Sequence, residues 1–189
     1  LLIVVPVGLI IVIIVQKGLP AINWQFLIDI PRQGMRAGGI FPAIIGTIYL
    51  VAGAIVFALP IGLLAAIYLS EYAKDSLLTR IIKLAIVNLA GVPSVVYGLF
   101  GLALFVVFFK FGASILSGSL TLGIMILPII VTTSREALES IPYSFREVSL
   151  SLGASKWQTI RHIVLPSAIP GILTGTILGL GRAAGETAP

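Results

Sequence analysis

Near the end of the chain lie Arg182 and Glu186, two residues of opposite charge that could form an ion pair or line a polar path. Side chains four residues apart share one face of a helix. If the preceding apolar residues form a membrane helix, depth decides the role of Arg182. Counted from Ile163, it lies ~28 Å along a helix, at the far interface, but counted from just after Pro170 only ~17 Å, inside the membrane. An arginine inside a membrane usually lines a polar path or pairs with an acid, whereas one at the interface is an anchor, so both readings stay open.

Catalytic and metal-binding patterns are missing from the sequence. His162 is the single histidine and the chain has no cysteine, so a metal site would lack its usual ligands. We find no Ser/His/Asp or paired-acid constellation, and no G-x-x-x-x-G-K-[ST] pattern of the kind that cradles ATP phosphates. We therefore expect no catalytic residue, no metal and no cofactor in this chain.

The amino-acid composition indicates which class of protein this chain belongs to. Apolar residues make up 58% of the chain, charged residues only 10%, and the mean hydropathy is +1.15. In soluble domains about a quarter of the residues are charged. Uncharged runs here exceed the ~20 residues that cross a bilayer, which predicts an integral membrane protein. The net charge of +5 needs no nucleic-acid partner to explain it, because membrane proteins concentrate Lys and Arg in cytoplasmic loops, and we expect none.

Five hydrophobic spans predict an all-α, polytopic transmembrane helical bundle that forms a single domain over residues 1–189. They cover residues 1–16, a part of 37–70, 84–109, a part of 111–134, and 163–181. The chain opens without Met and stops at "GETAP", so we interpret it as a fragment cut at both ends. The polar blocks 71–83 and 135–162 hold seven Lys and Arg against four in the remaining connections, which predicts that both blocks are cytoplasmic.

The polar stretch "REVSLSLGASKWQTIRHIVLP", residues 146–166, predicts a helix, a glycine and a second helix. Ser144 with Glu147, and Ser155 with Gln158, have the spacing of capping boxes. Gly153 is suited to end the first helix in a left-handed conformation. Three apolar residues of the first helix share one face and could dock a partner: Phe145, Val148 and Leu152.

Physical reasoning alone leaves the role of this stretch open. It could lie on lipid headgroups as an amphipathic loop, or it could be a socket for a cytoplasmic partner protein. A DNA-binding helix-turn-helix is a weaker reading, because both ends are tied to membrane spans and only Arg146, Lys156 and Arg161 supply positive charge.

The spacing of five residues in this stretch resembles the EAA loop of the membrane subunits of ABC importers. Glu147 is followed after five residues by Gly153, after nine more by Ile163, and after one more by Leu165-Pro166. Val148 and Ser149 stand where that family commonly has alanines. The resemblance implies that residues 135–165 form a cytoplasmic coupling loop that docks on an ATP-hydrolysing subunit. The residues it implies for coupling are Glu147, Ser149, Leu152, Gly153 and Ala154.

Longer segments resemble the phosphate-specific ABC importers, and within them the A-type (PstA-like) permease subunit. They include "LAGVPSVVYGLFGLALF" and "LPSAIPGILTGTILGLGRAAGETAP". The resemblance implies the type I permease fold with six core spans, about five of them present here, in the inner membrane of a prokaryote. It implies a C-type permease partner, two ABC ATPase subunits that bind ATP and Mg, and an extracytoplasmic phosphate-binding protein. The alternatives are a C-type phosphate permease or a permease for another oxyanion such as molybdate or sulfate.

Three further features acquire a meaning from this resemblance. It favours Arg182 and Glu186 as lining the substrate pathway, since a guanidinium offers paired donors to an oxyanion. Gly171, Gly175 and Gly179 form overlapping G-x-x-x-G spacings, which predict a close helix-packing face that could meet the partner permease. The segment "AGVPSVVYG" interrupts a span with Gly and Pro, which can mark a transport path or a packing kink.

Overall fold

The structure is a computed structural model that describes residues 4–34 and 37–187, and it divides the chain into the compact units Leu1–Ile48 and Tyr49–Pro189. In the first unit, α1 (Val4–Gly18) leads through the short turn η1 (Leu19–Ala21) to α2 (Trp24–Ile28). Asn23 caps α2, because its side-chain oxygen accepts a hydrogen bond from the backbone N–H of Phe26 at 2.8 Å. An isolated antiparallel bridge joins Arg32 and Ala37.

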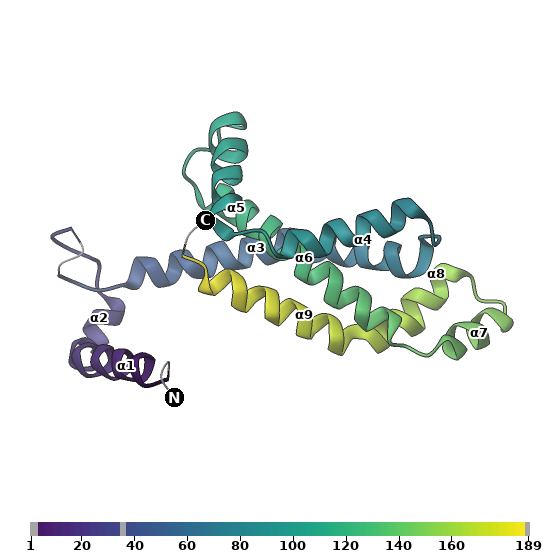
Figure 1. Cartoon of the computed structure of the whole chain (residues 1–189), viewed down its shortest axis with the longest axis horizontal. Helices are drawn as coiled ribbons and strands as arrows, with labels where there is room; N and C mark the ends of the chain where they lie inside the picture. The colour runs from purple at the N-terminus through teal and green to yellow at the C-terminus, as the bar shows by residue number, and fades with distance from the viewer. Residues whose placement is uncertain (1–3, 35–36, 188–189) are drawn as a thin grey trace. The chain divides into compact units, whose positions relative to one another are not determined.

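The second unit is built from helices, beginning within α3 (Phe41–Ile67). Figure 1 shows α3, α4, α6 and α9 as long helices, with α7 and α8 at one end of the unit. The elements that follow α3 are η2 (Tyr68–Tyr72), α4 (Leu77–Ala90), α5 (Ser94–Gly101), η3 (Leu102–Phe108), α6 (Ile115–Glu139), α7 (Tyr143–Ser151), α8 (Lys156–Thr159), η4 (Ile160–Val164) and α9 (Leu165–Gly185).

Helix α6 forms the centre of this unit, and its apolar side chains are the most deeply buried. Met125, Ile126 and Ile130 have no exposed surface. Helix α3 packs on them through small residues: a Cβ added to Gly62 would lie 2.8 Å from Cγ2 of Ile130. Close approach of backbones is the usual way in which membrane helices associate, since lipid offers no hydrophobic driving force between them.

The span expected over residues 84–109 is broken at the Gly and Pro residues that the sequence places inside it. Helices Leu77–Ala90 and Ser94–Phe108 are separate and bent by 100° at a short break, as in a broken span or a re-entrant loop. Pro93 has no N–H to donate and disfavours the helical conformation at Val92, so the helix ends at Ala90. The wide π-type turns η3 and η2 follow α5 and α3.

The structure corrects the expected boundary at Ile163, where the polar block was to end and the fifth span to begin. Helix runs without a break from Lys156 to Gly185, over 30 residues. The π-type turn η4 directly precedes Leu165 and Pro166. Such a wider turn shifts the preceding carbonyls away from the proline ring, which would clash with them in a regular α-helix. The second short helix of the stretch is therefore the beginning of the span itself.

Three helices of the described residues are long and apolar enough to cross a membrane: Phe41–Tyr72, Ile115–Glu139 and Lys156–Gly185. A fourth is added if the bent pair counts as one span. The expected first span, residues 1–16, falls partly outside the described residues; the 15-residue helix α1 covers its described part and continues to Gly18. The all-helical, multi-pass architecture predicted from composition is confirmed.

Candidate functional site

The first helix of the polar stretch begins earlier than the capping pattern predicts. Pro142 is the N-cap of α7, with no side-chain cap, so the capping box expected between Ser144 and Glu147 is wrong. Pro142 lacks the N–H that a helix start would leave unpaired, and its fixed φ of −53° suits this position. Its carbonyl accepts a hydrogen bond from Phe145 N–H at 3.2 Å, which places Ser144 inside the first turn.

The end of α7 and the start of α8 agree with the sequence pattern. Gly153 has a φ of +84°, and its N–H donates to the carbonyl of Leu150 at 3.0 Å. The N–H of Ala154 donates to the carbonyl of Ser149 at 3.2 Å, and together these bonds form a Schellman motif. At once Ser155 and Gln158 form the predicted capping box. The turn between α7 and α8 is therefore fixed by backbone geometry.

The apolar face predicted for the first helix is exposed. Phe145, Val148 and Leu152 are 53%, 62% and 83% exposed, and Glu147 beside them is exposed as well. Ser149 points the other way: its hydroxyl lies 2.8 Å from that of Thr159 on α8, and both residues are buried. Within α7, the structure thus separates an outward apolar face from an inward polar contact that holds α7 on α8.

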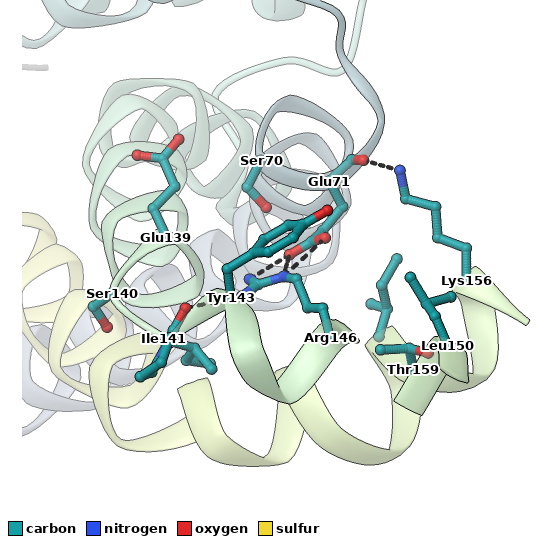
Figure 2. Close-up of a pocket in the computed structure, with 12 residues that line it drawn as sticks. Ser70, Glu71, Glu139, Ser140, Ile141, Tyr143, Arg146, Leu150, Lys156 and Thr159 are labelled. Carbon is teal, nitrogen blue, oxygen red and sulfur yellow. Dashed lines mark hydrogen bonds and ion pairs between the residues drawn. The ribbon is translucent and has the colours of Figure 1, made fainter. Parts of the chain in front are cut away.

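A cavity of about 560 Å³ lies between α7, α8, the end of α6 and η2 (Figure 2). Polar and charged side chains from all four elements face it. The hydroxyl oxygen of Ser70 at this cavity is buried and has no hydrogen-bond partner in the described part of the chain. The other lining residues are Glu71, Glu139, Ser140, Ile141, Pro142, Tyr143, Arg146, Leu150, Lys156, Thr159 and Ile160.

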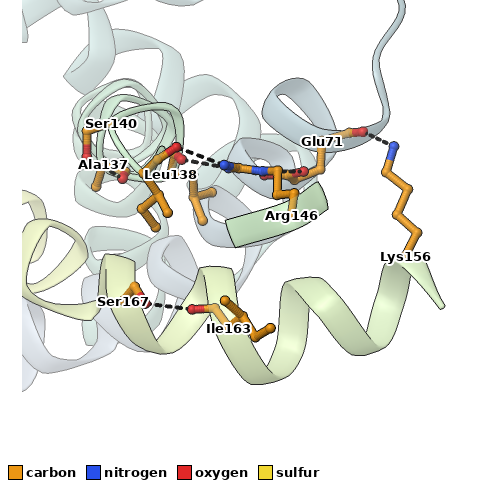
Figure 3. A network of polar contacts seen from close by, with 9 residues as sticks. Glu71, Ala137, Leu138, Ser140, Arg146, Lys156, Ile163 and Ser167 are labelled. Atoms are coloured by element: carbon orange, nitrogen blue, oxygen red, sulfur yellow. Dashed lines mark hydrogen bonds and ion pairs between the residues drawn. The ribbon is translucent and has the colours of Figure 1, made fainter. Parts of the chain in front are cut away.

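Arg146 of α7 connects three elements at this cavity (Figure 3). Its Nε and Nη2 bind the carboxylate of Glu71 on η2, with Nη2 2.6 Å from Oε1. Nη1 donates to the carbonyl of Ile141 at 2.8 Å, and Nη2 to that of Leu138 at 2.9 Å. The Arg146 and Glu71 side chains are only 11% and 8% exposed. No spacing rule predicts this pair, because its members lie 75 residues apart.

Lys156 adds a second contact between the polar stretch and η2. Its ammonium donates to the carbonyl of Glu71 and lies 4.8 Å from the centre of the Tyr72 ring, within range of a cation–π interaction. Figure 2 shows Arg146 and Lys156 approaching Glu71 from different helices. Sequence reasoning counted both cations only as charges of a cytoplasmic block and missed their common partner.

At the opposite end of α9, Arg182 contacts the broken span, although the two are far apart in the sequence. Arg182 lies in the last turn of α9, and its Nη1 donates to the carbonyl of Ala90 at 3.4 Å. Ala90 is the last residue of α4 before the break, so Arg182 meets the interrupted span at its interruption. Its Nε lies 3.8 Å from Oε1 of Glu186, with side chains 28% and 19% exposed. Tyr97 of α5 closes the same break by donating to the carbonyl of Leu89 at 2.8 Å.

The three glycines of α9 pack against α6 of the same chain. Their spacing predicted a close packing face, and the structure shows α6 as the helix on that face. A Cβ added to Gly171 or Gly175 would collide with Ala137 or Thr133, while one at Gly179 would lie 3.4 Å from Cγ1 of Ile130. The glycines therefore set the close approach of α9, which carries Arg182, to α6, which carries the carbonyl of Leu138 that Arg146 binds.

Comparisons with known proteins find a matching family model and several relatives. The model of the family described as binding-protein-dependent transport system inner membrane component matches residues 58–189. The chain is 34% identical to the probable ABC transporter permease protein YqgI of Bacillus subtilis, over 93% of this chain and 60% of that protein.

Two phosphate transport system permease proteins are also similar. The chain is 38% identical to PstA of Xylella fastidiosa, over 93% of this chain and 61% of the relative. It is 40% identical to PstA 1 of Mycobacterium tuberculosis, over 81% of this chain and 50% of the relative. The chain thus spans 50% to 61% of the length of these relatives. With its apolar helices and a match that includes the whole polar stretch, the chain belongs to the family of binding-protein-dependent transport system inner membrane components.

Proposed function

We propose that this chain is part of the A-type permease subunit of an ATP-driven importer for inorganic phosphate. The observation that carries the proposal is its similarity, at 38% to 40% identity, to several proteins named as phosphate transport permeases. The single domain expected over residues 1–189 would be the part of that subunit that contains the coupling loop. A C-type partner permease, two ABC ATPases that bind ATP and Mg, and an extracytoplasmic phosphate-binding protein complete the proposed transporter.

The exposed apolar face of α7 supports the proposed docking of an ATPase subunit. Phe145, Val148 and Leu152 lie outside the helical core, while Ser149 anchors the helix from behind. The Schellman motif at Gly153 and Ala154 fixes the angle at which α7 leaves the span. A helix held in this way can be displaced as a unit by a partner, since its backbone bonds are already satisfied. Glu147, exposed beside the apolar face, would meet the rim of the ATPase cleft.

The contact of Arg182 with the broken span supports a place for Arg182 and Glu186 on the substrate pathway. Interrupted membrane helices leave backbone groups without intrahelical partners, and such groups are tolerated only against protein or water. Arg182 satisfies one of them, the carbonyl of Ala90, through a single nitrogen. The long Nε–Oε1 separation of 3.8 Å from Glu186 leaves the guanidinium able to offer paired donors to a tetrahedral oxyanion.

Uptake by the complete transporter tests this proposal and its alternatives. The full-length protein is reconstituted with its partner permease, ATPases and binding protein in liposomes, and uptake of labelled phosphate, molybdate and sulfate is measured with and without ATP. ATP-dependent accumulation of phosphate alone is the expected result. Accumulation of molybdate or sulfate without phosphate would replace the substrate with another oxyanion. Complementation of strains lacking one permease subunit separates the A-type from the C-type assignment.

A further inference from the structure

Arg146 does more than neutralise the charge of buried Glu71, because its guanidinium also binds two backbone carbonyls. Four of the five guanidinium N–H groups are engaged, by the Glu71 carboxylate and by the carbonyls of Leu138 and Ile141. A buried pair often adds little net stability over apolar residues of similar size, because two charges lose their hydration. What the pair does add is a defined position of α7 relative to two other helices.

The receiving element is the turn in which α3 ends. Helix α3 changes from α-type to π-type geometry at Tyr68–Tyr72, and Glu71 lies within that turn. The wider turn carries Glu71 toward α7, where Arg146 and Lys156 bind its carboxylate and its carbonyl respectively (Figure 3). Turns of this type are frequent at functional sites. The polar stretch therefore holds one residue of the long apolar helix from two sides.

The same guanidinium also caps the end of α6. Leu138, in the last turn of α6, accepts a hydrogen bond from Arg146 Nη2 in addition to that from the backbone N–H of Ile141. Ile141, two residues beyond the helix, accepts one from Nη1. A displacement of α7 would thus act directly on the ends of both α3 and α6. Lysine could not reproduce this arrangement, because its three donors diverge from one nitrogen, whereas the guanidinium is a planar fork.

We propose that Arg146 is a positioning residue that, through Glu71 and the carbonyls of Leu138 and Ile141, makes α7 move as one body with the ends of α3 and α6. The inference rests on the proposed function, since it assigns the path by which displacement of the docked helix reaches the spans.

The first test compares Arg146→Lys with the same change at Arg161, an exposed arginine of η4. The reconstituted full-length transporter is assayed for phosphate moved and ATP hydrolysed. We expect Arg146→Lys to assemble and hydrolyse ATP while phosphate moved per ATP falls about tenfold, as loss of several charge-assisted hydrogen bonds implies. Arg161→Lys keeps the parent ratio. A purely structural role would lower both rates together, so an unchanged ratio in Arg146→Lys would overturn the inference.

The second test does not depend on substrate or on the stability of a variant. Residues 1–189 include no cysteine, so Tyr68→Cys and Ser151→Cys, both exposed positions, can carry spin labels once any cysteines elsewhere in the transporter are replaced. Their distance is measured in the full-length transporter without nucleotide and after ATP trapping. We expect the same distance in both states; a change of several ångströms would show that α7 separates from the end of α3 and would refute the inference. If the parent transports no phosphate, the proposed function fails, while this distance still decides the inference.

Discussion

Arg182 donates a hydrogen bond to the carbonyl of Ala90, so a charged residue at the end of α9 closes the gap where α4 stops. The contact spans 92 residues of sequence and joins the two features that sequence reasoning had treated as separate candidates for a transport path. Glu186, one helical turn further on, lies close enough to orient the guanidinium without binding all of its donors.

Replacing Arg182 with Gln should lower phosphate uptake by about tenfold or more while the transporter still assembles. The change removes the charge and the paired donors, which are worth about 1.5–3 kcal/mol per charged hydrogen bond, or about tenfold or more in rate. Arg182→Lys keeps the charge but not the fork, and it should be intermediate. Uptake of labelled phosphate by the complete transporter measures both. Arg161→Gln is the control, and wild-type uptake in Arg182→Gln would remove Arg182 from the pathway.

Gly153→Val should uncouple transport from ATP hydrolysis or prevent assembly with the ATPase, although the spans still insert. A Cβ at this position would meet no atom within 4 Å, so any effect comes from the backbone, whose φ of +84° is unfavourable for a β-branched residue. The cost is about 1–3 kcal/mol.

Gly153→Asn is the matched variant, since Asn tolerates left-handed conformations far better. It should retain most of the coupled uptake and of the co-purified ATPase. Equal behaviour of the Val and Asn variants would show that the conformation of this turn does not matter for coupling.

Leu152→Asp should weaken the association with the ATPase about tenfold, because it places a charge in the apolar face proposed to dock. Leu152 is 83% exposed, so folding of the permease itself should be unaffected. Leu77→Asp, at a leucine 76% exposed at the start of α4, is the control. The amount of ATPase that co-purifies with the full-length permease measures the effect. Undiminished recovery of the ATPase with Leu152→Asp would show that the apolar face of α7 is not its docking site.

Gly175→Ala should destabilise the packing of α9 on α6 by about 1–3 kcal/mol, the usual cost of overpacking. Its Cβ would collide with the side chain of Thr133, whereas a Cβ at Gly181 meets nothing within 4 Å, so Gly181→Ala should be neutral. Combining Gly175→Ala with Thr133→Ala removes the hydroxyl, the nearest clashing atom, but keeps the Cβ of residue 133 at 2.7 Å, so it should restore the parent melting temperature in detergent only in part. A double variant as unstable as Gly175→Ala would mean that the glycine matters for another reason.

The ends of α7 show how far local signals reach. The turn at Gly153 and the box of Ser155 and Gln158 could be predicted, because each depends on residues within one helical turn. The start of α7 could not be read from Ser144 and Glu147, because Pro142 offered a competing start whose fixed φ needs no side-chain cap. Both patterns were present in the sequence, and only the packed chain selected one.

The sequence by itself determined the class of this protein, its apolar helices, and the helix, turn and second helix of residues 146–166, because hydropathy, capping and the position of Gly153 are properties of neighbouring residues. Tertiary structure alone decided that Arg146 meets Glu71, that Arg182 meets the break after Ala90, and that the glycines of α9 face α6. The physical reason is that these contacts join separate helices, and their geometry depends on the π-type turn at Tyr68–Tyr72 and on the bend of 100° at the broken span. No periodicity within one segment encodes which carbonyl or carboxylate a distant guanidinium will reach.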